Sequence, residues 1–156
     1  MANNTENFQS QLVQGQIKLR LPAIQLSLVR IAEAIAQMSE EESWPDNVRF
    51  HVDLVLEVLV QNIVSYGYAD GRPGQIEISI RPFDEVLAIL IEDDADPFDP
   101  FSLDEPDIHA PLQERSIGGL GVHFARTFMD RYSYKRVNGH NRVELTKSLQ
   151  PDDPGN

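Results

Sequence analysis

Apolar residues recur along this chain at two spacings, one typical of helices and one typical of strands. Between Pro22 and about Glu40 they step by four, three, four and three residues, which predicts an amphipathic helix. Residues 16–21 and 76–81 alternate apolar with polar side chains, which predicts half-buried strands. Pro22 suits the first turn of the first helix, where its missing N–H leaves no intrahelical bond unmade.

The longest periodic stretch, residues 46–68, predicts a central helix with one apolar face and a polar stripe opposite. Asp46 suits its N-cap, and Gly67 can end it. Asn62 fits neither group, because at about 100° per residue it lies beside the apolar face. An unsatisfied buried carboxamide costs roughly 1–3 kcal/mol, so Asn62 either bonds to nearby backbone or faces a bound ion or ligand. The apolar face comprises Val48, Val52, Val55, Leu59, Ile63 and Tyr66.

The segment Val86–Asp93 is apolar on both faces, which predicts a central strand of the sheet. Only a short turn separates it from the strand 76–81, so the two must be antiparallel. Residues 94–117 then carry four prolines and many acids without clear periodicity. About two dozen such residues inside a compact domain are usually a functional loop or a disordered one.

The C-terminal part predicts a helix that opens at Gly118–Gly121 and ends near Asp130, then a hairpin of residues 132–137 and 142–149 around 138–141. Antiparallel strands with segregated helices predict an α+β fold, with the helices packed on one face of one mostly antiparallel sheet. We expect a loose N-terminal segment over 1–14, a single domain over 15–149 and a polar tail over 150–156.

Composition describes an acidic chain of 156 residues, with a net charge of −12 and no cysteine. The acidic balance argues against a general DNA- or RNA-binding surface, which needs clustered Lys and Arg. Without cysteines there is no disulfide framework and no thiolate metal site. The polar N-terminus does not resemble a signal peptide, and no apolar run approaches the length of about 18 residues that spans a membrane. We therefore expect a cytoplasmic protein without membrane association.

Three clusters of residues could carry chemistry. The central helix holds Asn62, the buried strand ends in the acids around Asp93, and a glycine run from Gly118 to Gly121 opens the third helix. Glycines before a helix let backbone N–H groups approach an anion, which the helix dipole favours, although such a run can also be a hinge. Asp93 could accept hydrogen bonds from a ligand amine or cap the loop that follows it.

Taken together, these residues resemble a known fold. Asn62, Asp93 with Phe98-Asp99-Pro100, and Gly119-Leu120-Gly121 look like the N, G1 and G2 boxes of the GHKL ATP-binding fold, also called the Bergerat fold. Within that superfamily the chain is similar to the anti-sigma-factor serine/threonine kinases of bacterial partner-switching systems, the RsbW and SpoIIAB type. The segments Asn62–Tyr68 and Leu145–Lys147 add to the likeness, which covers roughly residues 16–149.

The resemblance implies a role for each of these positions. Asn62 would hold Mg²⁺ near the phosphates of ATP or ADP, and Asp93 would accept a hydrogen bond from the adenine amino group. Mg²⁺ fits because it takes few protein ligands and shares substrate phosphates. Residues 94–118 would form a lid, in which Arg115 is either a phosphate contact or a solvated side chain. The implied nucleotide-binding positions are Asn62, Asp93, Ala95, Phe98, Arg115, Gly119, Leu120, Gly121 and Thr146.

Two positions depart from the family pattern. The general base of the family is a Glu one helical turn before the Asn, where this chain has Val58. The neighbouring Glu57 is the candidate for a catalytic residue, but it lies about 140° round the helix from Asn62. Losing a base typically removes a factor of roughly 10²–10⁴ in rate. Ala95 stands where the first box has Gly, and a positive φ there would cost about 1–2 kcal/mol, whereas an ordinary φ would make Ala95 harmless.

Two functions therefore compete. The first is an ATP-dependent serine kinase that sequesters a sigma factor and phosphorylates an anti-anti-sigma (STAS-type) partner. The second is a catalytically impaired partner-binding module on the same fold; Val58 and Ala95 favour it, whereas Asn62, Asp93 and the glycines favour retained ATP binding. A stand-alone ATPase of histidine-kinase type fits less well, because the sequence lacks a phosphoacceptor helix pair. We favour a nucleotide-binding regulator of the anti-sigma class, with a homodimer implied only by resemblance.

Overall fold

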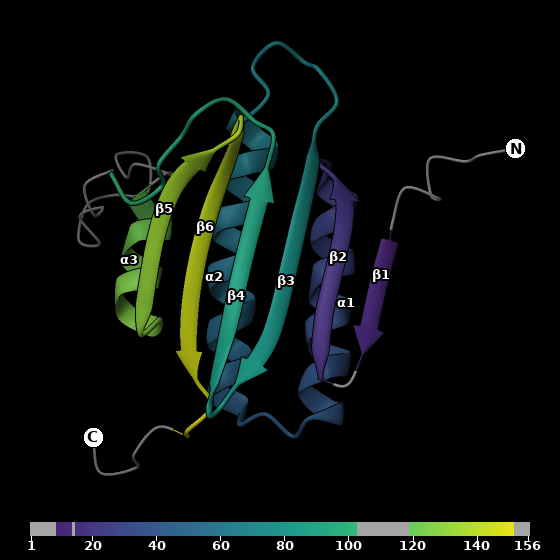
Figure 1. Cartoon of the computed structure of the whole chain (residues 1–156), viewed down its shortest axis with the longest axis vertical. Helices are drawn as coiled ribbons and strands as arrows, with labels where there is room; N and C mark the ends of the chain where they lie inside the picture. The colour runs from purple at the N-terminus through teal and green to yellow at the C-terminus, as the bar shows by residue number, and fades with distance from the viewer. Residues whose placement is uncertain (1–8, 14, 103–118, 152–156) are drawn as a thin grey trace, which may run out of the picture.

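The computed structural model describes residues 9–13, 15–102 and 119–151. They form three helices and one six-stranded sheet in the order β1-β2-β3-β4-β6-β5, in which all neighbours are antiparallel (Figure 1). The elements are β1 (Gln9–Val13), β2 (Gln16–Pro22), α1 (Gln25–Glu41), α2 (Asp46–Tyr66), β3 (Gln75–Phe83), β4 (Val86–Asp93), α3 (Gly119–Phe128), β5 (Arg131–Val137) and β6 (His140–Ser148).

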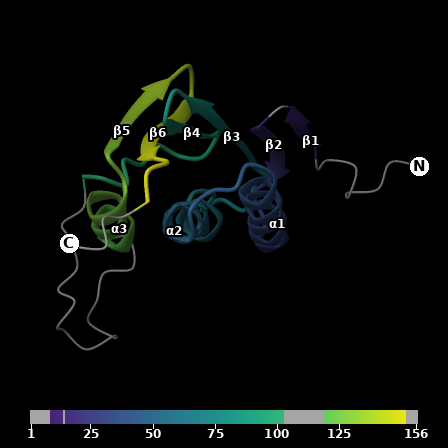
Figure 2. The same ribbon diagram turned by 90° about the horizontal axis from the view of Figure 1, so that it is seen from below.

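All three helices pack on the same face of the sheet (Figure 2), which confirms the predicted α+β fold. The helix α2 lies between α1 and α3 and contacts both. Among the described residues, no helix covers the opposite face. Along β4, Leu87, Ile89 and Ile91 are buried, whereas the alternate side chains are only partly buried. The strand β4 is central as predicted, but only one of its faces enters the core.

The core fills the space between the sheet and the helices. Every second side chain is buried along the first part of β3, and the buried positions of α2 recur at helical spacing. Each fully buried aliphatic side chain contributes roughly 1.5–3 kcal/mol. Tyr66 departs from the predicted apolar face, because it is the last residue of α2 and is 58% exposed at the border of a cavity. The buried residues of α2 are Val48, Val52, Val55, Leu56, Leu59, Val60 and Asn62.

Two helix starts differ from the predictions. The helix α1 begins at Gln25 rather than at Pro22, which ends β2 and accepts a hydrogen bond of 2.5 Å from the Ser27 hydroxyl. The N-cap of α2 is Pro45 rather than Asp46. Asp46 lies in the first turn of α2, where its negative charge interacts favourably with the helix dipole. No helix within the described parts of the chain is long and apolar enough to cross a membrane.

The strand β1 is not predicted by the sequence pattern. It lies within residues 1–14, which we expected to be loose, and pairs with β2, so that expectation is wrong for these five residues. An edge strand is held by backbone hydrogen bonds to its single neighbour, so a polar sequence can form one without a periodic apolar signal.

The last hairpin is tighter than predicted. Asn138 and Gly139 alone form its turn, with φ of 50° and 80°, as a type I′ turn requires. His140 and Asn141 therefore belong to β6, and Asn141 pairs with Asp93 across the two neighbouring strands. The turn thus sets a polar side chain beside the end of β4.

Candidate functional site

A cavity of about 160 Å³ opens where α2, the end of β4 and the start of β6 meet. Its volume compares with the roughly 150 Å³ cavity that binds benzene, so it has room for one ring system. Apolar side chains form most of its wall, and a few polar groups converge on it, which is typical of small-molecule sites. The polar side chains in the lining include those of Asn62, Asp93, Asp96 and Asn141.

Asp93 is the last residue of β4 and is 4% exposed. Its Oδ1 accepts hydrogen bonds from the Ala95 N–H (3.0 Å) and from Asn141 Nδ2 (2.8 Å). Burial raises the pKa of this carboxyl group, and the two donors lower it in part. No described residue bonds to Oδ2, which leaves one carboxylate oxygen for a donor in the cavity.

Asn62 meets the start of α3 on another wall of the cavity. Asn62 is 5% exposed, and its Nδ2 has no hydrogen-bond partner within the described chain. Gly121 approaches α2 so closely that an added Cβ would lie 3.0 Å from Leu59 and 3.9 Å from Asn62 Nδ2. The N–H groups of the first helical turn have no intrahelical acceptor. Gly119, Leu120 and Gly121 thus start a helix beside an unpaired carboxamide, an arrangement suited to an anion.

The C-terminal end of α3 is fixed by a buried lysine of β6. Lys147 Nζ donates to the Phe128 carbonyl (2.8 Å) and lies 2.9 Å from His51 Nδ1 on α2. The His51 ring also stacks on Phe128, with 4.2 Å between the ring centroids. A cation suits this end of a helix, because the last carbonyls carry partial negative charge. These contacts tie α3 to both α2 and the sheet, and so help to position its glycine-rich start.

Ala95 has an ordinary backbone conformation. It is not among the described non-glycine residues with positive φ, so Ala95 carries no left-handed backbone strain. Its methyl group is accommodated by Gly67, where an added Cβ would lie only 2.7 Å from the Ala95 Cβ. Gly67 itself has φ −73°, so this close approach, rather than a left-handed conformation, is what requires a glycine at the end of α2.

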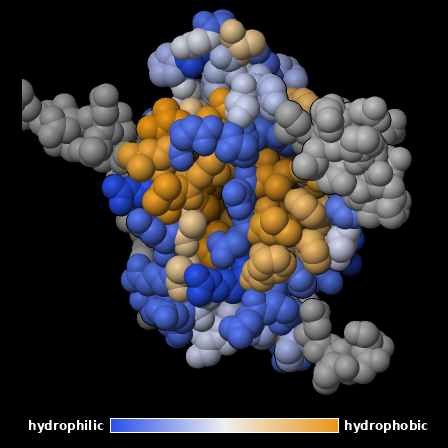
Figure 3. All heavy atoms as spheres, turned by 180° about the vertical axis from the view of Figure 1, so that it is seen from behind, coloured by the Kyte–Doolittle hydropathy of each residue, from blue (hydrophilic) through white to orange (hydrophobic). Residues whose placement is uncertain are grey.

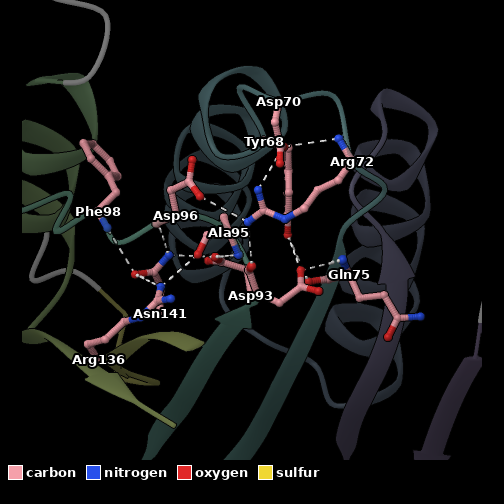
Figure 4. Close-up of polar contacts among 11 residues, drawn as sticks. Tyr68, Asp70, Arg72, Gln75, Asp93, Ala95, Asp96, Phe98, Arg136 and Asn141 are labelled. Atoms are coloured by element: carbon pink, nitrogen blue, oxygen red, sulfur yellow. Dashed lines mark hydrogen bonds and ion pairs between the residues drawn. The ribbon is translucent and has the colours of Figure 1, made fainter. Parts of the chain in front are cut away.

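The loop between α2 and β3 holds the chain just after Asp93 (Figure 4). Asp94 Oδ1 accepts hydrogen bonds from the Tyr68 hydroxyl (2.6 Å) and the Gln75 N–H (3.0 Å). Burial would raise the pKa of Asp94, but these donors outweigh it and hold the pKa below its ordinary value. Arg72 donates to the Asp94 carbonyl and to Asp96 Oδ1, both at 3.2 Å. The exit from β4 is therefore anchored on this side.

The structure brings only some of the predicted site residues to the cavity. Phe98 lines it, together with Asn62, Asp93 and Ala95. Thr146 does not, because it pairs with Ala88 on the opposite face of the sheet, where it borders a broad hollow of about 1080 Å³. The prediction that places Thr146 beside the nucleotide is therefore wrong.

The predicted catalytic candidate is also misplaced. Glu57 is exposed on α2 and does not line the cavity. Val58, at the position of the family's base, is half-buried and lies 3.8 Å from an added Cβ at Gly121. An apolar group thus stands beside the start of α3 where a base would be needed. Arg115 and Gly118 lie outside the described residues.

Asn141 lines the cavity, although the sequence pattern places it in the hairpin turn over residues 138–141. Its side chain bonds to Asp93 and to the loop that follows it. The signal was present in the Asn138-Gly139 dipeptide, which favours a two-residue turn and so starts β6 before Asn141.

Comparison with known proteins supports the same fold. Residues 21–147 match the family described as histidine kinase-like ATPase domain. The solved histidine kinase domain from the blue-light activated histidine kinase of Erythrobacter litoralis EL346 matches with a TM-score of 0.52 and 15% identity, over 89% of this chain and 66% of that one. At this identity the likeness concerns the fold alone.

Two curated relatives are protein kinases by description. The serine/threonine-protein kinase BtrW of Bordetella bronchiseptica is 29% identical over 111 residues, which cover 71% of this chain and 78% of that protein. The serine-protein kinase RsbW of Bacillus subtilis is 30% identical over 95 residues, which cover 56% of this chain and 57% of that protein. The match to RsbW thus spans little more than half of each chain.

Proposed function

The chain belongs to the histidine kinase-like ATPase family, and we propose that it is an ATP-binding regulator of the anti-sigma class with little or no phosphoryl-transfer activity. The observation that carries this proposal is the pairing of two open polar groups at one cavity. Asp93 has a carboxylate oxygen without a partner in the described chain, and Asn62 has an unpaired buried amide. A buried group left unsatisfied is costly, so each is expected to meet a ligand.

The base of the nucleotide would occupy the cavity. A carboxylate accepts hydrogen bonds only, so Asp93 Oδ2 would take one from the exocyclic amine of adenine. Leu59, Ile63 and Ile91 supply apolar wall for the ring faces. The volume of about 160 Å³ accommodates a ring system but not a triphosphate, so the phosphates would extend toward the start of α3.

The phosphates would lie beside Asn62 and the first turn of α3. The backbone N–H groups of Gly119, Leu120 and Gly121 suit phosphate oxygens, and the absence of side chains at the two glycines permits a close approach. The described residues contain no cluster of three His, Cys, Asp or Glu that could hold a metal ion. A magnesium ion would therefore be carried by the phosphates, with the Asn62 carboxamide oxygen as a protein ligand; it would neutralise phosphate charge.

Phosphoryl transfer is expected to be slow, because no described acid reaches the base position. Val58 occupies it, and Glu57 is exposed and does not line the cavity. This observation favours the second candidate function, a partner-binding module that senses nucleotide without turning it over. Positioning and charge stabilisation account for most of phosphoryl-transfer catalysis, so a low residual rate is compatible with this site.

The proposed partners, in the cytoplasm, are a sigma factor and an anti-anti-sigma protein of STAS type. A second copy of this chain, in a homodimer, is the third proposed partner. The helix face supports protein binding, since hydrophobic areas flank a hydrophilic band on it (Figure 3). Ile24, Leu26 and Val29, at the start of α1, are each about half exposed. Contiguous exposed apolar side chains often mark protein-binding surfaces.

Calorimetric titration with ATP and with ADP, each with and without Mg²⁺, tests the proposal. We expect both nucleotides to bind and Mg²⁺ to strengthen the binding of ATP. Absence of heat and of thermal stabilisation at millimolar nucleotide would overturn the nucleotide role. The chain would then be a fold retained for partner binding alone.

A further inference from the structure

The amide nitrogen of Asn141 is completely engaged by the end of β4 and the loop after it. Asn141 Nδ2 donates to Asp93 Oδ1 (2.8 Å) and to the Asp96 carbonyl (2.9 Å). An amide nitrogen carries two hydrogens, so none remains for a ligand. Asn141 lines the cavity and is 4% exposed, yet it cannot donate to whatever binds there.

The carboxamide oxygen of Asn141 is engaged as well. It accepts from the Phe98 N–H (3.1 Å) and from Arg136 Nη1 (3.1 Å) (Figure 4). It also accepts from the Tyr134 hydroxyl (2.6 Å). Three donors around one oxygen fix which way the side chain points, because a flipped amide would set its N–H groups against them. The nitrogen of Asn141 must therefore face Asp93.

A fixed Asn141 leaves Asp93 one orientation. Oδ1 is occupied by Asn141 and by the Ala95 N–H, and the Ala95 carbonyl is itself held by Arg136 Nη1 at 2.8 Å. The oxygen that remains open to the cavity is then always Oδ2, and as a carboxylate it only accepts. Such a group pairs with a 6-amino purine and opposes the carbonyl lone pairs of a 6-oxo purine.

We propose that Asn141 is a positioning residue that sets the base preference of this site, acting through Asp93 rather than on the nucleotide. The proposal rests on the proposed function, in which the cavity takes the base of ATP. Without the Asn141 amide, the carboxyl group of Asp93 is free to turn and loses a donor that stabilises its charged form. A carboxylate that turns no longer holds one oxygen in place to accept from a 6-amino group, and a protonated carboxyl group can donate to a 6-oxo group, so discrimination between the two purines weakens.

The test compares ATP with inosine triphosphate, which differs by the 6-oxo group, in calorimetric titrations of the wild type and of Asn141→Ala. We expect the wild type to prefer ATP and the preference to fall about tenfold in the variant, mainly through weaker ATP binding. A merely structural role would weaken both nucleotides equally and leave the ratio unchanged. Arg142→Ala is the matched control, because its side chain lies on the opposite face of the sheet and pairs with Glu92 and Glu144.

Two further variants decide the outcome if Asn141→Ala does not fold, which thermal unfolding without nucleotide will show. Asn141→Asp keeps the shape and the three donors around the oxygen but removes the N–H group that faces Asp93, so the preference should fall as in Asn141→Ala. Tyr134→Phe removes one donor to Asn141 and leaves its Asp93 bond, so a smaller fall is expected. A wild type that prefers ATP, with Asn141 variants that keep the same ratio, would overturn this inference alone. A wild type that binds neither nucleotide would overturn the proposed function with it.

Discussion

The two walls of the cavity differ in how fully their polar groups are satisfied. Around Asp93, side chains of the α2–β3 loop and of β5 and β6 hold the backbone of residues 94–98 by named hydrogen bonds. Around Asn62, the described residues supply no partner at all for a buried amide nitrogen. We call the first the base end, comprising Asp93–Phe98 and Asn141, and the second the phosphate end, comprising Asn62 and Gly119–Gly121.

The difference indicates different tasks. A base end whose groups are saturated, apart from one carboxylate oxygen, is preorganised and can select a ligand without rearranging. A phosphate end with an unpaired buried amide is less stable alone than with its ligand, because the desolvation cost is repaid only on binding. Removing the unpaired amide at the phosphate end should therefore stabilise the nucleotide-free protein, whereas crowding the closely packed base end should destabilise it.

The largest expected effect is a gain of function beside the phosphate end. Val58→Glu places a carboxylate one turn before Asn62, next to the start of α3. We expect steady-state ATP hydrolysis to rise by roughly 10²-fold or more, the usual contribution of a general base. Val58→Gln, with the same shape and no basic group, is the control. Equal rates in the two variants would contradict the role of this position.

The next effect is at the base end. Asp93→Asn keeps an acceptor for Ala95 and Asn141 and turns the group facing the cavity into a donor. ATP affinity measured by calorimetry should fall about 100-fold, and the preference should move toward inosine triphosphate. Asp94→Asn is the matched control, since Asp94 does not line the cavity, and should leave the preference unchanged.

The same two variants should differ in the pH dependence of unfolding. Burial raises the pKa of Asp93 above its ordinary value of 3.8. Between pH 3.8 and the folded-state pKa, the folded wild type therefore holds a proton that the unfolded chain has lost, and the free energy of unfolding falls as the pH rises through this range. Asp93→Asn should thus gain stability over wild type near neutral pH but not below about pH 3.8. The pKa of Asp94 is lowered, so Asp94→Asn should lose stability near neutral pH. Denaturant unfolding from pH 3 to pH 7 measures the two changes in unfolding free energy. Changes of the same sign in the two variants would contradict the opposite pKa shifts of Asp93 and Asp94.

A third effect concerns the contact between Gly67 and Ala95 at the base end. Gly67→Ala would set two methyl carbons 2.7 Å apart and should destabilise the protein by about 1–3 kcal/mol. Adding Ala95→Gly should recover part of that loss but not all, because the Ile63 carbonyl also lies 2.7 Å from the new Cβ. Additive losses in chemical denaturation of the single and double variants would show that the two positions do not touch.

The smallest effect has the opposite sign and lies at the phosphate end. Asn62→Leu removes an unsatisfied buried amide, so the nucleotide-free protein should gain about 1 kcal/mol, or roughly 2–4 °C in thermal midpoint. Mg²⁺ should then no longer strengthen ATP binding. Asn47→Leu is a matched control, because its Nδ2 is also buried without a partner in the described chain but lies at the far end of α2. Asn47→Leu should also stabilise the protein, but Mg²⁺ should still strengthen ATP binding to this variant. Loss of the strengthening by Mg²⁺ in Asn47→Leu would contradict the role of Asn62 as the metal ligand.

The sequence was informative where periodicity and side-chain chemistry act locally. The helical spacing around Asn62 and the end of a buried strand at Asp93 predicted the helix and the strand that carry these two residues. The phase of Asn62 at the edge of the apolar face was enough to raise a ligand role, and its missing partner now supports that role.

The failures occurred where long-range pairing decides the outcome. The neighbours of Thr146 in β6 face the core, so Thr146 faces the opposite side of the sheet. Only the register between β4 and β6 shows this, because it pairs Thr146 with Ala88. Asn141 was assigned to a turn, although the Asn138-Gly139 dipeptide favours a shorter one. The edge strand β1 carries no apolar pattern, so pairing with β2 could not be read from its residues.

The side-chain amide resonances of Asn62 and Asn141 test the two-ended site most directly. In ¹⁵N-labelled protein, assigned with Asn62→Leu and Asn141→Ala, adenosine should shift the Asn141 amide and, to a smaller extent, the Asn62 amide, since both side chains line the cavity. ATP with Mg²⁺ should shift the Asn62 amide much further, because only the triphosphate extends to the start of α3. Shifts confined to the outer face of the sheet around Thr146, with both amides unmoved, would contradict the account.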